Sequence, residues 1–191
     1  MLPPHFFARL LALLLIGLPF SAGAQARIAV AANFAEAARQ LADDYGRKSG
    51  HRIEISSAST GKLYAQIVNG APFDVLLSAD DTTPRKLADE GLADATTLHD
   101  YAIGRLVLWS RDPQRVKDGE TLLRKGAIER LAIANPELAP YGAAARDALH
   151  YVRRWEELKP KLVMGENVGQ AAQFVVSGAA PLGLLPRSLV L

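Results

Sequence analysis

Short apolar segments alternate with amphipathic segments through most of the chain, after an apolar N-terminal stretch. Residues 34–47, 61–68, 84–90, 143–151 and 168–176 are predicted to be helices. The strands are predicted at 27–32, 52–56, 74–77, 101–109, 131–134, 161–164 and 182–185. Alternation of strand and helix predicts an α/β fold with mainly parallel sheets flanked by helices. Residues 110–120 are polar and rich in turn formers, so a surface loop is expected there.

Residues 1–26 have the pattern of a secretory signal peptide. Arg9 is followed by the apolar run 10–18 (LLALLLIGL), then Pro19 and a stretch of small residues. Cleavage is expected after Ala26, with Ala24 as the alternative. A membrane anchor is the competing interpretation, but the run is well short of the roughly 20 residues that cross a bilayer. The mature chain is therefore expected to be exported.

Composition narrows the classes of function. Of the 191 residues, 49% are hydrophobic and 22% are charged, an ordinary balance for a folded domain rather than a disordered one. The 22 Lys and Arg against 20 Asp and Glu give a net charge of +2, without the basic block of a nucleic-acid-binding protein. The chain has no cysteine, which excludes disulfides, thiolate metal sites and cysteine nucleophiles.

The signals for catalysis and for metal binding are weak. His51, His99 and His150 are scattered without ligand-like spacing, so no metal site is expected. Residues 59–62 (STGK) suggest a phosphate-binding P-loop, but the motif requires a glycine at position 56, which is Ser56. A serine hydrolase using Ser59 remains an alternative, although no histidine is tied to it by sequence. We therefore predict that the chain is not an enzyme.

Small polar residues stand where predicted strands lead into predicted helices. Asn33 follows the first strand, and Ser59 and Thr60 follow the second. Open α/β sheets bind ligands at the carboxyl ends of parallel strands, and helix N-termini present free N–H groups that suit anions. Plain helix capping would use the same residue types, so both interpretations remain open at this point.

Several segments together resemble the periplasmic molybdate-binding proteins of ABC importers. They are 30–34 (VAANF), 57–67 (SASTGKLYAQI), 69–80 (NGAPFDVLLSAD), 101–110 (YAIGRLVLWS), 133–136 (IANP), 139–142 (APYG) and 165–168 (GENV). The resemblance runs in order through nearly all of the mature chain. It implies a solute-binding protein that captures molybdate or tungstate and delivers it to a membrane permease, as a periplasmic monomer without a cofactor. There are two alternatives. The chain could bind another oxyanion such as sulfate or phosphate, or it could be a truncated remnant that binds nothing.

The resemblance also implies an oxyanion site. Its ligand-binding residues would be Ala32 and Asn33 in the first loop, Ser59 in the second, and Tyr141 and the backbone N–H of Val168 from the other half of the molecule. Lys62 is expected to point to solvent, because a charge on a long flexible stem discriminates poorly between anions.

The implied architecture is a two-lobed, type II-like periplasmic-binding-protein fold. Lobe 1 is expected at 27–105, lobe 2 at 106–183, and the start of a return crossing to lobe 1 at 184–191. Hinges are expected near 101–105 and 183–185. Members of the family continue for several tens of residues beyond the last residue here, so an incomplete first lobe is expected.

Overall fold

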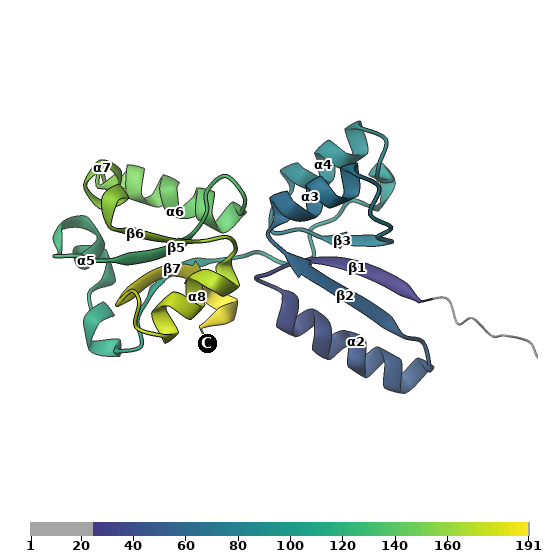
Figure 1. The fold of residues 1–191 in the computed structure, drawn as a ribbon, viewed down its shortest axis with the longest axis horizontal. Coiled ribbons are helices and arrows are strands. Elements are labelled where there is room, and N and C mark those ends of the chain that lie inside the picture. The colour runs from purple at the N-terminus through teal and green to yellow at the C-terminus, as the bar shows by residue number, and fades with distance from the viewer. Residues whose placement is uncertain (1–24, 191) are drawn as a thin grey trace, which may run out of the picture.

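The computed structural model describes residues 25–190, which form two sheet-centred lobes joined by an extended crossing (Figure 1). Nearly all of the expected signal peptide, residues 1–24, lies outside the described residues.

The first lobe is built on a three-stranded parallel sheet of order β2-β1-β3. Helix α2 packs on one face of the sheet, and α3 and α4 lie on the other (Figure 1). The elements are β1 (Ala26–Ala31), α2 (Ala35–Ser49), β2 (Ile53–Ala58), α3 (Thr60–Val68), β3 (Val75–Leu77), α4 (Thr82–Asp89) and the 3₁₀ turn η1 (Ala95–Thr97).

The second lobe has a four-stranded sheet of order β4-β7-β5-β6, in which only the β4–β7 pair is antiparallel. Helices α6 and α8 cover its two faces (Figure 1). The strands are β4 (Leu106–Trp109), β5 (Leu131–Ala134), β6 (Leu162–Gly165) and β7 (Leu182–Pro186). The helices are α5 (Gly119–Lys125), α6 (Pro140–Tyr151), α7 (Trp155–Leu158) and α8 (Val168–Val176), with 3₁₀ turns η2 (Pro113–Val116), η3 (Lys159–Lys161) and η4 (Arg187–Leu189). The predicted α/β class, with mainly parallel sheets flanked by helices, is confirmed.

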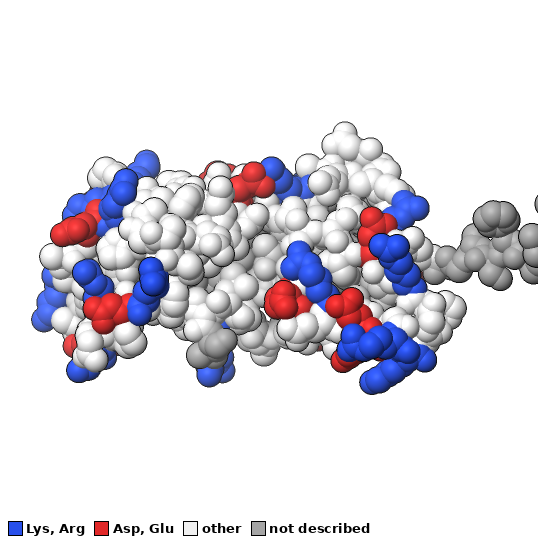
Figure 2. Space-filling view, turned by 60° about the horizontal axis from the view of Figure 1, so that its bottom comes forward, with Lys and Arg blue, Asp and Glu red and all other residues white. Residues whose placement is uncertain are grey.

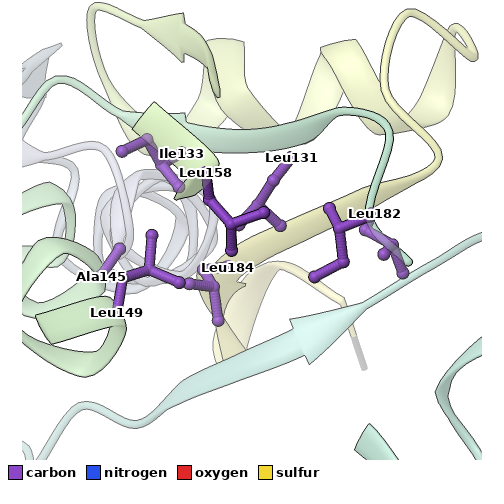
Figure 3. Close-up of a cluster of buried hydrophobic side chains, with 8 residues drawn as sticks. Leu131, Ile133, Ala145, Leu149, Leu158, Leu182 and Leu184 are labelled. Atoms are coloured by element: carbon purple, nitrogen blue, oxygen red, sulfur yellow. The ribbon is translucent and has the colours of Figure 1, made fainter. Parts of the chain in front are cut away.

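The core of the second lobe lies on both faces of the central strands. All four residues of β5 and all five of β7 are buried. Leu131 and Ile133 of β5 pack with Leu182 and Leu184 of β7 on the α6 side (Figure 3). Ala132 and Leu185 face α8 instead. Because successive side chains alternate between the two faces, a strand covered on both sides is apolar throughout, as in a buried parallel sheet.

The return crossing to the first lobe was expected to start at residue 184, and this starting point is wrong. Leu184 pairs with Leu108 and Leu185 pairs with Val107, so both belong to β7 in the second sheet. The same pairing shows that the hinge expected at 183–185 is misplaced, since these residues are fixed in a buried strand. The chain leaves the sheet only after Pro186.

Two further expectations differ from the structure. The strand predicted at 101–109 is limited to β4, because 101–105 run between the lobes and pair with no strand in the described part of the chain. The predicted loop 110–120 contains η2 and the start of α5. Asp112 and Asp118 cap these two elements by accepting hydrogen bonds from the backbone N–H groups of Gln114 and Thr121.

Candidate anion-binding site

The pairing of strands brings the predicted polar turns together. In the first lobe Ala31 pairs with Ala58, and the N–H of Ala32 donates to the carbonyl of Ala58 at 3.0 Å. The turns that carry Asn33 and Ser59 therefore lie side by side. In the second lobe β5 and β6 end together in the same way, which brings the start of α6 close to the start of α8.

A small cavity of ≈ 10 Å³ lies between these turns, with walls from both lobes. It has about the space that one water molecule needs. The first lobe contributes Ala31, Ala32, Asn33, Ser59, Thr60 and Ala79, and the second contributes Ala139, Pro140, Tyr141, Asn167 and Val168. All five residues predicted for the oxyanion site are among them. The structure thus brings the five residues together, while their role as ligands remains a prediction.

Two polar atoms at this cavity are buried without a hydrogen-bond partner among the described residues. They are Oδ1 of Asn33 and Oγ of Ser59. Ser59 is the N-cap residue of α3, yet its side chain makes no capping hydrogen bond. Plain helix capping therefore does not explain Ser59. A buried polar atom without a partner costs roughly 1–3 kcal/mol, and a ligand that bonds to it would remove that cost.

The donors around the cavity carry no formal charge. None of the lining residues is Asp, Glu, Lys, Arg or His. Tyr141 is the second residue of α6 and Val168 is the first of α8, so their backbone N–H groups have no carbonyl partner within their own helices. Helix N-termini also carry a partial positive charge. The side chains can donate as well: Ser59 through its hydroxyl, and Asn33 through Nδ2 if its amide turns by half a revolution. The arrangement suits an anion that only accepts hydrogen bonds.

Tyr141, which lines the cavity, and the nearby Tyr101 both stay neutral at physiological pH. Burial raises the pKa of the Tyr141 phenol above its ordinary value. Burial also raises the pKa of Tyr101, and the nearby Tyr141 adds to this shift. The Tyr101 hydroxyl donates to the carbonyl of Ser78 at 2.7 Å, which ties the crossing segment to the first lobe. A protonated Tyr141 hydroxyl remains available as a donor.

Three contacts join the two lobes beside the cavity. The N–H of Gly61 donates to the carbonyl of Leu138 at 2.9 Å. The hydroxyl of Ser188, in η4, donates to the carbonyl of Asn33 at 2.9 Å. The Lys62 ammonium lies 2.6 Å from the carboxylate of Glu166. Lys62 was expected to point to solvent, and its side chain is nearly half exposed and does not line the cavity. The pairing of its charge with a residue of the other lobe was not expected.

Thr60 and Asn167 also line the cavity, although neither is among the five predicted ligand-binding residues and only Thr60 was noted as a polar residue at a strand-to-helix turn. The buried Thr60 hydroxyl accepts a hydrogen bond from the N–H of Ala79 at 3.3 Å. The Asn167 side chain caps α8 by accepting from the N–H of Gln170 at 3.0 Å. The available signal was their position, since each stands next to a predicted site residue at the start of a helix.

The face shown in Figure 2 has basic and acidic side chains interspersed over both lobes.

Within residues 25–190, no helix combines the length and apolar character needed to cross a membrane. The same part of the chain has no group of three or more His, Cys, Asp or Glu side chains placed to hold a metal ion.

The model of a family described as bacterial extracellular solute-binding protein matches residues 26–191. The chain belongs to this family. The molybdate-binding protein ModA of Azotobacter vinelandii is similar to this solute-binding protein, with 47% identity over 167 residues, which is 87% of this chain and 66% of the relative. ModA of Rhodobacter capsulatus is 43% identical over 92% of this chain and 69% of its own length.

The solved structures show the same likeness. The periplasmic molybdate-binding protein of Azotobacter vinelandii superimposes with a TM-score of 0.80 at 40% identity, covering 84% of this chain and 71% of that one. The sulfate-binding protein SubI of Mycobacterium tuberculosis superimposes with a TM-score of 0.63 at 14% identity over 85% of this chain and 64% of its own, a likeness of fold alone. The solute-binding protein therefore spans about two thirds of the length of the relatives it matches.

Proposed function

We propose that this chain is an exported solute-binding protein that captures molybdate or tungstate between its lobes and delivers the anion to an ABC permease. The observation that carries the proposal is the buried Ser59 hydroxyl, which has no hydrogen-bond partner among the described residues and lies at a cavity whose lining is uncharged. The Asn33 amide, whose Oδ1 also lacks a partner there, can present Nδ2 to the same anion once the amide is turned. The names of the two relatives, both molybdate-binding proteins, support the choice of ligand.

The chemistry of the donors favours a fully deprotonated tetrahedral oxyanion. Molybdate near pH 7 offers only acceptors, which match hydroxyl, amide and backbone N–H groups. Phosphate is partly protonated there and also needs an acceptor, which a lining without carboxylates supplies poorly. Charge-assisted hydrogen bonds contribute roughly 1.5–3 kcal/mol each, so about six would give a gross 9–18 kcal/mol. Micromolar binding needs only about 8 kcal/mol, which leaves room for the cost of closing the lobes.

Capture requires the lobes to part. A cavity of ≈ 10 Å³ between the lobes is too small to admit a four-oxygen anion without movement of its walls. The segment 101–105 joins the lobes without strand pairing, so we place a hinge there. Opening would break the contacts of Gly61 and Lys62 with the second lobe, and closing on the anion would restore them.

Export to the periplasm through the N-terminal leader is part of the proposal. Ala26 is the first residue of β1 and pairs with Ile53. Cleavage after Ala24 would keep this strand whole, whereas cleavage after Ala26 would remove its first residue. We therefore favour a mature N-terminus at Gln25, and intact-mass measurement of the exported protein tests it. A mature chain that begins at Arg27 would contradict this choice.

Thermal unfolding with a panel of oxyanions tests the proposed ligand. A ligand that binds only the folded state raises the melting temperature by mass action. Molybdate and tungstate should raise it, while sulfate and phosphate at equal concentration should raise it less. A larger shift with sulfate would assign the site to that anion. No shift with any oxyanion, in a protein that unfolds cooperatively, would contradict the proposal. We propose further that the protein acts as a monomer, needs no cofactor and catalyses no reaction.

A further inference from the structure

The ring of Tyr141 is seated against Gly104, in the segment that joins the lobes. A Cβ atom on Gly104 would lie 2.9 Å from Cζ of Tyr141 and closer still to its hydroxyl oxygen. Real Cβ atoms essentially never approach another atom within 3.0 Å, so the hydroxyl fills the space that a side chain on Gly104 would occupy. The close contact therefore joins a residue of the cavity wall to the inter-lobe segment.

The ring of Tyr141 has little freedom to move away. Tyr141 is 9% exposed and belongs to a buried cluster with Ala134, Ala139 and Val168. Ala32 and Ala79 of the first lobe pack against the same cluster. Residues of both lobes thus pack around Tyr141, and the backbone of Gly104 lies against its hydroxyl.

The requirement for glycine here is one of space rather than of backbone conformation. Gly104 is not among the glycines with positive φ, so alanine could adopt its backbone conformation. Its neighbour Ile103 is 90% exposed, which shows that a large side chain is tolerated one residue earlier. The exclusion of a side chain at residue 104 comes from Tyr141.

We propose that Gly104 is a positioning residue of the anion site: its missing side chain sets the place of the Tyr141 hydroxyl. This inference rests on the proposed function, in which Tyr141 is a donor to the anion. A hydrogen bond weakens steeply when donor and acceptor move beyond about 3.2 Å. A methyl group at residue 104 would displace the hydroxyl and spoil its alignment with an anion bound between the lobes.

The first test compares Gly104→Ala with the parent protein, using molybdate as the probe in calorimetric titrations of the full chain. Gly119→Ala is the matched control, because a Cβ there would meet only Leu108 Cδ2, at an ordinary 3.7 Å. We expect Gly104→Ala to weaken molybdate binding at least tenfold and Gly119→Ala to leave it within twofold of the parent. Parent-like affinity in Gly104→Ala would overturn the inference.

The second test needs no ligand. It asks whether Gly104→Ala acts through its contact with Tyr141 or through reduced flexibility of the inter-lobe segment 101–105. Gly104→Ala is made in the parent and in a Tyr141→Ala background, and the unfolding midpoint of each protein is measured. We expect the substitution to lower the midpoint in the parent and to leave it unchanged without the tyrosine ring. An equal fall in both backgrounds would overturn the inference. A parent protein that unfolds cooperatively but does not bind molybdate would instead overturn the proposed function.

Discussion

Lys62 and Glu166 form an ion pair between the lobes, with Nζ of Lys62 2.6 Å from Oε1 of Glu166. Lys62 lies in the first turn of α3, and Glu166 lies between β6 and α8. Both side chains remain nearly half exposed, so water and salt screen the pair. The pair therefore stabilises the closed arrangement of the lobes only weakly. It does not supply the free energy of anion binding.

Lys62→Ala is accordingly expected to change molybdate affinity by less than about fivefold, since exposed ion pairs contribute about 0–1 kcal/mol. The measurement is a titration of both proteins at low and at high salt, where the small difference should shrink further. Reversing both charges, in Lys62→Glu with Glu166→Lys, should restore the parent value. A loss above tenfold in Lys62→Ala would show that the ammonium contacts the anion directly.

Ser59→Ala is expected to weaken molybdate binding by about 1–3 kcal/mol while leaving the fold intact, because it removes a donor whose oxygen has no protein partner. Asn33→Ala should have an effect of similar size. Without ligand, Ser59→Ala should unfold at the same temperature as the parent or slightly higher, since a buried unpartnered hydroxyl is unfavourable. Calorimetric titration and thermal unfolding check the two halves of this prediction.

Ser57→Ala is the matched control for Ser59→Ala. Ser57 is an exposed residue of β2, two positions before Ser59. It should bind molybdate as the parent does. Equal affinity of the Ser59 variant and this control would mean that Ser59 is not a ligand.

The pH dependence of binding follows from the Tyr141 phenol. Burial raises its pKa above the ordinary value of about 10, so it is protonated and can donate throughout the neutral range. Affinity measured from pH 7 to about 9.5 should be flat, and it should fall above pH 10, where a phenolate would repel the anion. Because the folded state favours the neutral phenol, its contribution to stability is complete below about pH 10 and is lost as pH rises further.

Tyr141→Phe provides the control for this titration. It should bind more weakly at pH 7 and lose the part of the alkaline decline that comes from Tyr141. An affinity in the parent protein that already falls by half near pH 8 would contradict the assigned role of Tyr141.

Local patterns predicted the elements well where a single lobe determines them. The ranges expected for β5 and α8 agree with the structure, because buried apolar runs and a helix start after a small polar residue are local signals. The site residues were predicted from a resemblance combined with strand-to-helix turns. The parallel register of β1 and β2 places Ala31 beside Ala58 and so brings the turns that follow these strands together.

Features that depend on both lobes were not predictable in the same way. The partner of Lys62 is more than a hundred positions away in the chain, and no local pattern reports how closely the lobes approach. The end of β7 was placed too early, because its continuation through Pro186 depends on antiparallel pairing with β4. The close contact between the Tyr141 hydroxyl and Gly104 likewise results from tertiary packing.

Calorimetric titration of the folded, monodisperse mature chain with sodium molybdate tests the central claim most directly. We predict saturable binding of one molybdate per chain at micromolar or lower concentration, a binding free energy of about 8 kcal/mol or more, with sulfate binding more weakly. Absence of binding to either anion at two temperatures, in protein that unfolds cooperatively, would contradict it.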